Sequence, residues 1–478
     1  MAFLVGGANS ASGAYEISNS CRFDGSSSYL NHTHESGNKD TFTWSSWIKF
    51  GDLNNDSSAD VLFSASDTSY IAIRFEDKQL DFVNYDGSDT AEVSTNRLFR
   101  DVSAWYHIVV AIDMTQSTDS NRVKLYVNGS QETSFATAAY QPQNQDTVVN
   151  TAIEHRIGRE SGNYFSGYMA DVNFIDGTAY AASAFGETND NGVWIPKKPD
   201  VTYGTNGYFL EFKQTGTSAN SSGIGADTSG EDNHHAVSGL AATDITVDTP
   251  TNNFCTINPL HRNADDTDQS YTEGNLKYTN ETSHFRTVIG TMFAQNGKWY
   301  FEMEWTGGSQ SFIGVVRDDD ISDHENSYLG SSGWATGGSI GYYSATGESN
   351  GQLYTGGGGS STWNASWDVD DIVMCAMDLD NNKLYFGLNG TWQASGDPTS
   401  GATGTGSAYD LASGYHWGPA ATTQYHSSVG NGVISLNFGF PSFTISSGNA
   451  DANGYGNFEF APPSGYYALC TKNLAEFG

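Results

Sequence analysis

The sequence has few basic residues and few cysteines, and each shortage excludes a class of function. Its 478 residues include 21 Lys and Arg against 55 Asp and Glu, a formal net charge of -34. This charge repels phosphate backbones and anionic lipid, so we expect no nucleic-acid binding. The four cysteines, Cys21, Cys255, Cys375 and Cys470, form no Cys-x-x-Cys or Cys/His cluster. No zinc site is therefore predicted, and free buried thiols are expected.

Long apolar runs are also missing. No stretch reaches the roughly 20 apolar residues that a membrane-spanning helix needs. The N-terminal MAFLVGGANSASG lacks basic residues, and its apolar run is too short for a signal peptide. We therefore expect no membrane insertion, and release with an assembly or by lysis rather than secretion.

Aromatic residues and glycine are abundant. The chain contains 11 Trp, 26 Tyr, 26 Phe and 54 Gly. Aromatic side chains favour pleated sheets, and frequent glycine indicates many turns. A chain of this length exceeds a single hydrophobic core, so an all-β fold with more than one domain is predicted.

Alternating apolar residues predict strands in the first half of the chain. Residues 41–50 place Phe42, Trp44 and Ile48 on one face and polar side chains on the other, which predicts a half-buried strand. Residues 105–112 are apolar on both faces, as in a central covered strand. The run 122–129 ends in Asn-Gly, the dipeptide of a tight hairpin.

The second half repeats this design after a polar stretch. Residues 299–305 alternate Trp, Phe, Met and Trp on one face. KLYFGLNG at 383–390 echoes KLYVNG at 124–129, which favours two sandwiches of related design. We predict two β-sandwich, jelly-roll-like domains in tandem, over 1–249 and 291–478, joined by a connecting segment over 250–290.

Two family resemblances support this division. Residues 21–177, with CRFDGSSSYL, FTWSSWIKF, WYHIVVAIDM and YMADVNFIDG in order, resemble the laminin G-like, concanavalin A-like jelly roll. Residues 297–469, with GKWYFEMEW, IGYYS, DIVMCAMDLDNNKLYFGLNGTW and PPSGYYAL, resemble a SPRY domain. Residues 207–240 look like the opening of a laminin G-like domain although they follow its body. They are predicted to fold back beside the N-terminal strand.

Residues 185–204, FGETNDNGVWIPKKPDVTYG, and 248–260, DTPTNNFCTINPL, look like the connection in uncharacterised structural proteins of marine phages. This resemblance implies a non-enzymatic virion protein assembled in the host cytoplasm, a tail-fibre or surface adhesin for host glycan or protein. The alternative is a capsid-decorating or fibre-spacer protein that contacts other virion proteins. Phage fibres and spikes are commonly trimeric, so a homotrimer is expected by analogy.

Aromatic loops are the leading candidates for ligand contact. Aromatic rings stack on the apolar faces of sugars while neighbouring Asp and Asn side chains bind hydroxyls. In SPRY domains the ligand surface is built from loops at one end of the sandwich. The resemblance therefore implies Trp334, Tyr343, Trp363 and Asp368 as ligand-binding residues, with a role in the core as the alternative.

No cofactor is required by this function, but one loop has calcium-binding chemistry. Asp52, Asn54 and Asp56 alternate oxygen ligands as calcium loops do. Laminin G-like domains sometimes hold calcium at a sandwich rim, which the resemblance extends to this loop. The glycine and distant glutamate of an EF-hand are absent, so a solvated turn explains the same residues.

A glycan hydrolase is the third hypothesis. Glu302 and Glu304 lie two residues apart on one strand face, and retaining glycosidases need carboxyls about 5 to 5.5 Å apart. SPRY domains carry a glutamate in this strand without any hydrolase role, which favours a structural interpretation.

Overall fold

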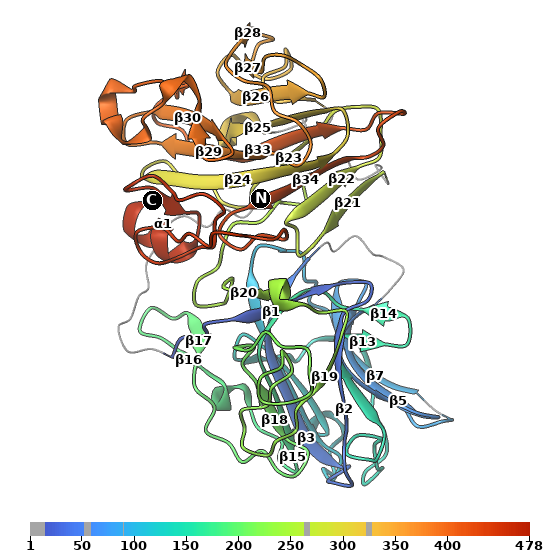
Figure 1. Ribbon diagram of the computed structural model, residues 1–478. Coiled ribbons are helices and arrows are strands. Elements are labelled where there is room, and N and C mark those ends of the chain that lie inside the picture. The colour runs from blue at the N-terminus through green and yellow to red at the C-terminus, as the bar shows by residue number, and fades with distance from the viewer. Residues whose placement is uncertain (1–14, 52–58, 89, 262–267, 322–326) are drawn as a thin grey trace. The chain divides into compact units, whose positions relative to one another are not determined.

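The computed structural model describes residues 15–51, 59–88, 90–261, 268–321 and 327–478. The chain divides into two compact units between Thr251 and Asn252. Each unit is built from stacked, mainly antiparallel sheets (Figure 1). The predicted all-β fold with two β-sandwiches is therefore confirmed. Within the described ranges, no helix is long and apolar enough to cross a membrane.

The first sheet of the N-terminal unit has the order β10-β9-β8-β3-β15-β1-β20, and β18 also pairs with β15. Its strands are β1 (Ser20–Asp24), β3 (Thr41–Phe50), β8 (Trp105–Asp113), β9 (Val123–Val127), β10 (Ser130–Gln131), β15 (Ser166–Asp176), β18 (Tyr208–Leu210) and β20 (Ile245–Thr246).

The second sheet of this unit has the order β11-β7-β6-β5-β4-β12-β2-β19. Its strands are β2 (Tyr29–Thr33), β4 (Asp60–Ser66), β5 (Tyr70–Glu76), β6 (Gln79–Tyr85), β7 (Thr90–Thr95), β11 (Phe135–Ala139), β12 (Glu154–Ile157) and β19 (Ala236–Ser238). Two short hairpins complete the unit, formed by β13 (Arg159–Glu160) with β14 (Asn163–Tyr164), and by β16 (Gly186–Thr188) with β17 (Trp194–Pro196).

Apolar side chains from both sheets form the core of the N-terminal unit. Phe42, Trp44 and Ile48 of β3 belong to the same buried cluster as Phe63 and Ile73 of the second sheet. Each of these side chains is at most 1% exposed. The apolar face predicted for residues 41–50 is therefore the core face of β3.

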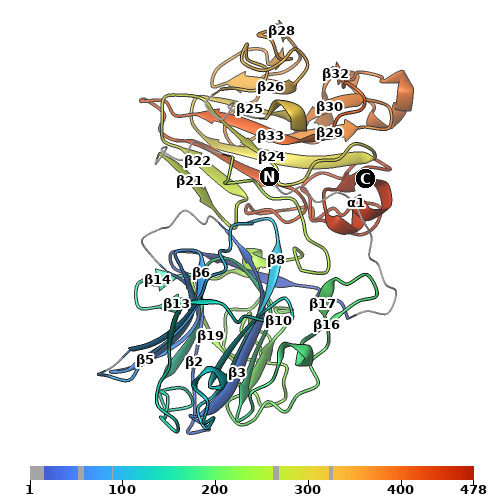
Figure 2. The ribbon, with the colours of Figure 1, turned by 180° about the vertical axis from the view of Figure 1, so that it is seen from behind.

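The other face of β3 departs from the prediction of a half-buried strand. Thr43, Ser45 and Lys49 are buried as well. The Thr43 hydroxyl donates to the backbone oxygen of Thr178 at 2.8 Å, and the Ser45 hydroxyl lies 3.0 Å from Nε2 of His107. His107 belongs to β8, the strand that pairs with β3. Figure 2 labels both strands. Later parts of the chain cover this face, so its polar residues pair with protein groups instead of water.

The two Asn-Gly sites form tight turns, as the sequence indicates. Asn128 and Gly129 have φ of 47° and 79°, and Asn389 and Gly390 have φ of 45° and 82°. Two successive positive φ values match the twist of an antiparallel hairpin, and Asn and Gly tolerate them best. The first turn joins β9 to β10, and the second joins β30 (Lys383–Leu388) to β31 (Thr391–Trp392).

The segment after the sandwich body returns to it, as predicted for residues 207–240. Strand β18 pairs with β15, and β19 pairs with β2 through Ala236–Ser238. The edge of β1 is taken by β20 instead, slightly later in the chain. Both strands of this segment thus pair within the N-terminal unit.

The C-terminal unit has a nine-stranded and a six-stranded sheet, in the orders β21-β22-β34-β24-β29-β30-β31 and β23-β33-β25-β26-β27-β28. Strands β32 (Tyr409–Asp410) and β35 (Tyr467–Ala468) pair beside β30 and β24. The remaining strands are β21 (Gln269–Thr272), β22 (Lys277–Asn280), β23 (Arg286–Ile289), β24 (Lys298–Gly307), β25 (Gln310–Arg317), β26 (Ser339–Ala345), β27 (Gln352–Tyr354), β28 (Ser360–Thr362), β29 (Ile372–Asp378), β33 (Trp417–Gln424) and β34 (Gly432–Asn437).

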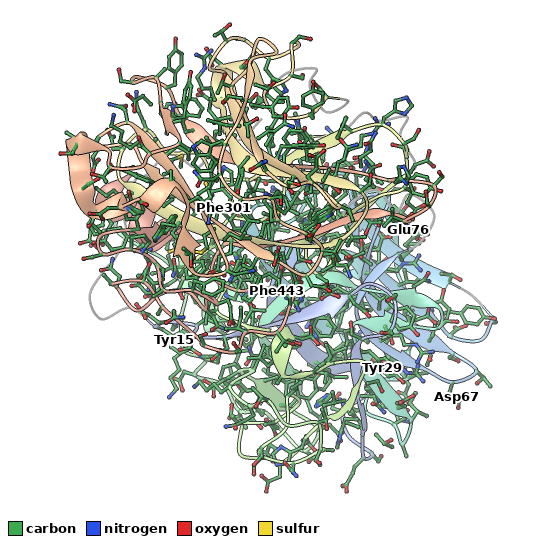
Figure 3. The ribbon with its side chains drawn as sticks, turned by 45° about the horizontal axis from the view of Figure 1, so that its top comes forward. Tyr15, Tyr29, Asp67, Glu76, Phe301 and Phe443 are labelled. Carbon is green, nitrogen blue, oxygen red and sulfur yellow. The ribbon has the colours of Figure 1, made fainter. Side chains whose placement is uncertain are left out.

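The segment 250–290, expected as a connection, supplies β21, β22 and β23 to these sheets. The aromatic strand predicted at 299–305 is β24, and Phe301 on it is fully buried (Figure 3). A short helix, α1 (Thr471–Phe477), follows β35. The four cysteines are buried, and none of these described residues forms a disulfide, as expected.

Candidate functional site

Trp334 and Tyr343, two of the four expected ligand residues, lie in the core of the C-terminal unit. Both belong to one buried cluster and are 1% and 8% exposed. The Trp334 indole N–H donates to the Tyr328 backbone oxygen at 2.9 Å, and the Tyr343 ring lies 4.8 Å from that of Phe312. These rings pack against protein, so the expectation of exposed stacking surfaces is wrong for this pair.

Trp363 and Asp368, the other two, reach the surface. Trp363 is half-buried, with its ring perpendicular to that of Tyr342 at 5.0 Å. Asp368 is exposed, and its Oδ1 accepts a hydrogen bond from the Gly347 N–H at 3.3 Å. Ligand contact by these two residues stays a prediction.

The calcium hypothesis rests on Asp52, Asn54 and Asp56, which lie outside the described residues. Nearby Asp60 accepts a hydrogen bond from the Ser166 N–H at 3.1 Å. Among the described parts of the chain, no group of three or more His, Cys, Asp or Glu side chains could hold a metal ion. Calcium binding by this loop therefore remains a prediction.

The two carboxylates of the hydrolase hypothesis have different surroundings. Glu302 is 0% exposed. Its carboxylate accepts hydrogen bonds from the Tyr300 hydroxyl at 2.8 Å and the Asn437 amide at 2.9 Å, and from the two N–H groups of residues 459–460 at 3.0 and 2.8 Å. Glu304 is partly exposed.

These contacts give Glu302 a structural role. Burial raises the pKa of Glu302, although the hydrogen bonds to its carboxylate oppose the shift. Burial and the charge of Asp370 also raise the pKa of Glu304. Both oxygens of Glu302 already accept two hydrogen bonds each, so a glycosidic oxygen cannot approach this carboxyl group. The carboxylate instead fixes residues 459–460 to β24.

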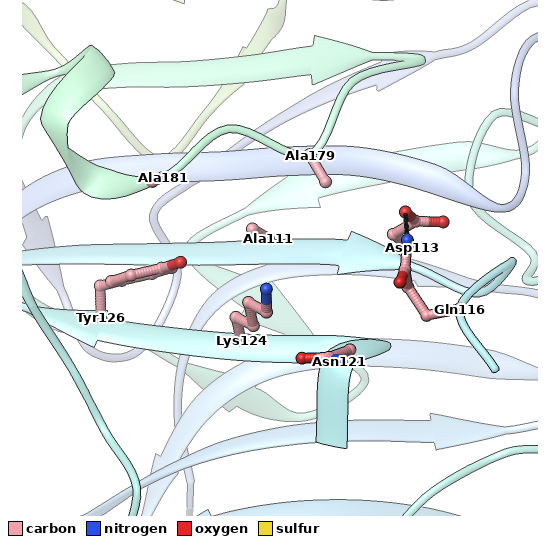
Figure 4. Close-up of a pocket in the computed structure, with 8 residues that line it drawn as sticks. All are labelled: Ala111, Asp113, Gln116, Asn121, Lys124, Tyr126, Ala179 and Ala181. Carbon is pink, nitrogen blue, oxygen red and sulfur yellow. Dashed lines mark hydrogen bonds between the residues drawn. The ribbon is translucent and has the colours of Figure 1, made fainter. Parts of the chain in front are cut away.

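A polar pocket in the N-terminal unit offers a better candidate site (Figure 4). Its volume of about 340 Å³ is near the lower end for small-molecule sites. Strands β8 and β9, the 3-10 turn η1 (Asp119–Asn121) and the segment after β15 supply its walls. The lining residues are Ala111, Asp113, Gln116, Asn121, Lys124, Tyr126, Ala179 and Ala181.

The alternation of β9 explains how the polar groups reach this pocket. Val123, Leu125 and Val127 point into the core, so Lys124 and Tyr126 point to the opposite face and are half-buried. Two alanines from the segment after β15 line the pocket with little side-chain volume.

Asp113 is held in a fixed orientation at one end of the pocket. Its Oδ1 accepts hydrogen bonds from the Thr115 N–H at 3.1 Å and the Thr115 hydroxyl at 2.5 Å. Its Oδ2 accepts one from the Gln116 amide at 2.6 Å (Figure 4). Burial alone would raise the pKa of Asp113, but these hydrogen bonds and the charge of Lys124 lower it. Asp113 therefore presents a charged acceptor at neutral pH.

The pocket combines a carboxylate, two amides, an ammonium group and a phenol ring. Lys124 makes no hydrogen bond or salt bridge within the described chain, so its ammonium group can donate to a ligand. A sugar needs such paired donors and acceptors for its hydroxyls and a ring for its apolar face. Sequence reasoning missed this site, although the alternation within VKLYVNG places Lys124 and Tyr126 outside the core.

Family comparisons agree with this architecture. The Concanavalin A-like lectin/glucanases superfamily matches residues 24–184, and the SPRY domain family matches residues 298–409. The N-terminal unit thus contains a concanavalin A-like domain and the C-terminal unit a SPRY domain. The chain thus has two β-sandwich units, one similar to the concanavalin A-like superfamily and one similar to SPRY domains. A search of curated proteins found no match.

Several solved structures match parts of the chain at low sequence identity. The SPRY domain of human HERC1 is 15% identical, with 34% of this chain and 87% of that chain covered and a TM-score of 0.25. A SAP-like pentraxin from Limulus polyphemus is 16% identical, with coverage of 35% and 80% and a TM-score of 0.26. The PSpry domain of TRIM65 is 13% identical, with coverage of 38% and 91% and a TM-score of 0.28.

Proposed function

We propose that this protein is a non-enzymatic bacteriophage virion protein, a tail-fibre or surface adhesin that binds a host glycan. The observation that carries glycan binding is the pocket of the concanavalin A-like unit, where Asp113, Asn121 and Lys124 surround a space beside the Tyr126 ring. The virion assignment rests on the resemblance of residues 185–204 and 248–260 to marine phage structural proteins.

The absence of catalysis is part of the proposal. Glu302 is buried under four hydrogen bonds, so the paired-carboxylate mechanism lacks one accessible group. A host-surface protein in place of a glycan, and a homotrimeric assembly, are finer points of the same proposal.

Binding is tested with the full-length chain on an array of neutral and acidic oligosaccharides, followed by calorimetry with the best ligand. Loss of the stacking ring in Tyr126→Ala should weaken binding at least about tenfold. Tyr415→Ala is the matched control, because Tyr415 is also half-buried and lies in the other unit. No binding to any glycan, or equal weakening by both variants, would contradict the pocket as the site.

Two further measurements address catalysis and location. A reducing-end assay on each bound polysaccharide should show no release of sugar, and release that Glu304→Gln abolishes would favour a hydrolase. Labelled protein should bind host cells by itself. Docking to phage particles without binding to cells would instead support the capsid-decorating or fibre-spacer alternative.

A further inference from the structure

Four histidines from separate segments of the N-terminal unit gather beside β2. His32 lies on β2, His34 directly follows it, His155 lies on β12, and His235 directly precedes β19. The rings of His34 and His155 are stacked, with centroids 3.5 Å apart and planes 4° apart. The His32 ring lies 5.8 Å from that of His34 and 5.4 Å from that of His235.

Three of these rings are buried, and the hydrogen bonds of His155 require its neutral form. His34, His155 and His235 are each 1% exposed. Nε2 of His155 accepts a hydrogen bond from the Asn150 N–H at 3.2 Å, while its Nδ1 lies 3.0 Å from the Ile153 backbone oxygen. One ring nitrogen must therefore accept and the other donate, which only a neutral imidazole can do.

His34 is fixed by the side chain of the same asparagine. The Asn150 amide donates to the Asn38 backbone oxygen at 2.6 Å and to Asp176 at 2.8 Å, so its Oδ1 accepts from Nδ1 of His34 at 3.0 Å. Nε2 of His34 is buried and has no hydrogen-bond partner within the described chain. A proton on this nitrogen would be a buried, unpaired charge.

The histidines hold the returning segment 227–238 on β2. Nδ1 of His32 lies 3.1 Å from the His234 backbone oxygen, and Nδ1 of His234 accepts a hydrogen bond from the Asp227 N–H at 2.9 Å. Besides these contacts, β19 pairs with β2 at three residue positions. The imidazole contacts therefore add to this pairing and to the hydrogen bonds that the Asn233 amide donates to the backbone oxygens of Thr205 and Gly207.

Few charged groups face this cluster. Asp227 acts on His32 from the returning turn, and Arg156 acts on His155 from β12. Exposed Asp232 lies 3.9 Å from Nε2 of His234. Of the remaining neighbours, Glu154 pairs with Arg156, Asp176 contacts Asn150, and the Tyr208 ring lies 4.4 Å from that of His235.

We propose that this histidine cluster is an acid-sensitive clasp, whose protonation releases segment 227–238 and exposes the edge of β2. Its geometry fits such a device, because a proton on Nε2 of His155 breaks the hydrogen bond from Asn150. A proton on Nε2 of His34 places an unpaired charge beside the stacked ring of His155. The released edge would present unpaired backbone groups of Tyr29–Thr33 for pairing with another strand.

The direction of the pH effect follows from the buried state. Burial lowers the pKa of His155 to about 3, and it lowers the pKa of His34, His235 and His32 as well. Released histidines return to their ordinary pKa of about 6.5. The stability of the clasp is therefore complete above pH 6.5 and is lost as the pH falls from 6.5 toward 3.

Hydrogen exchange of the full chain at pH 7.5 and pH 5.0, corrected for intrinsic rates, tests the clasp. Each histidine that protonates only in the released state should raise the opening equilibrium about 30-fold at pH 5.0. Protection should fall in 29–33 and 227–238, and stay unchanged in β24 and β29, which contain no histidine. Unchanged protection of 227–238 would overturn the proposal, and this measurement needs no variant.

Variants then identify the groups responsible. His32→Gln should lose part of the pH response, because glutamine cannot take up a proton in this pH range. His32 is half-buried, and the glutamine side chain still offers a hydrogen-bond donor, so the fold should be retained. His155→Gln should lose more of it. His426→Gln, an exposed histidine of the C-terminal unit, is the matched control and should respond as the wild type does. An undiminished response in both cluster variants would contradict the assignment to these histidines.

Discussion

The Lys49 ammonium group lies 2.8 Å from Oδ2 of Asp248, and the two side chains are 1% and 0% exposed. The indole N–H of Trp105 donates to the other carboxylate oxygen of Asp248 at 3.3 Å. This buried pair joins β3 to a segment almost 200 residues later, at the end of the N-terminal unit. It explains why a lysine can lie on a covered strand face.

Removal of one partner should be costly, because the other charge stays buried without its counter-ion. We expect Lys49→Met to lower the free energy of unfolding by about 3 to 5 kcal/mol, measured by urea denaturation. The double variant Lys49→Met with Asp248→Leu should recover most of this loss. A single variant as stable as the wild type would mean that the pair contributes little.

Glu302 should matter for stability and not for chemistry. Glu302→Ala leaves buried donors of Tyr300, Asn437 and residues 459–460 without an acceptor, and each such donor costs about 1 to 3 kcal/mol. We therefore expect a loss of several kcal/mol in the free energy of unfolding. Glu304→Gln on the same strand face is the control and should change it little, since burial already disfavours the charge of Glu304. Equal losses in both variants would contradict this role.

Strand positions could be predicted from the sequence because alternation is local. β3, β9 and β24 follow the apolar pattern, and the two Asn-Gly turns follow from the φ values that these residues tolerate. The cover on the outer face of β3 could not be predicted, because its partners lie far along the chain. His107 and Asp248 are bonded to Ser45 and Lys49 across 62 and 199 residues.

The candidate ligand site was predicted less well, because it also depends on contacts between distant parts of the chain. Trp334 and Tyr343 occupy a glycine-rich stretch without clear alternation before β26 and on it, where a sequence does not distinguish core rings from exposed rings. The pocket beside Tyr126 depends on the packing of the segment after β15 against β8 and β9. Such a tertiary arrangement leaves no short motif.

Asp171 should make the stability of the N-terminal unit depend on pH in a second way, opposite in sign to the effect of the histidines. It lies at an irregularity of β15 with φ of 47° and is 6% exposed. Burial raises its pKa to about 7, while a hydrogen bond with Tyr15 opposes the shift. The stability that the protonated group contributes is complete below its ordinary pKa of 3.8 and is lost as the pH rises through 7.

Asp171→Asn should remove this loss, because asparagine is neutral and tolerates the positive φ. Relative to the wild type, the free energy of unfolding of the variant should rise between pH 4 and pH 8 by up to about 4 kcal/mol. Urea denaturation at several pH values measures this difference. Exposed Asp190→Asn is the control and should show no such trend. A constant difference across this range would contradict a buried, neutral Asp171.

Trp194 packs directly on two glycines, so the requirement for glycine at these two positions can be tested. A Cβ atom at Gly186 would lie 2.5 Å from the Trp194 ring, and one at Gly129 would lie 2.4 Å from it. The same ring donates its N–H to Nδ1 of His107 at 3.0 Å. Trp194 therefore attaches the β16–β17 hairpin to the outer face of the first sheet only while both positions lack a side chain.

Gly186→Ala should displace the indole ring and break its hydrogen bond to His107, because the added methyl group meets ring atoms on a packed surface. We expect a loss of about 1 to 3 kcal/mol in the free energy of unfolding. Burial lowers the pKa of His107 to about 3, so displacement of the ring should raise this pKa, measured by NMR titration. Gly162→Ala is the matched control, since a Cβ atom there meets nothing within 4 Å. Equal stability of the two variants would show that the hairpin tolerates a shifted indole.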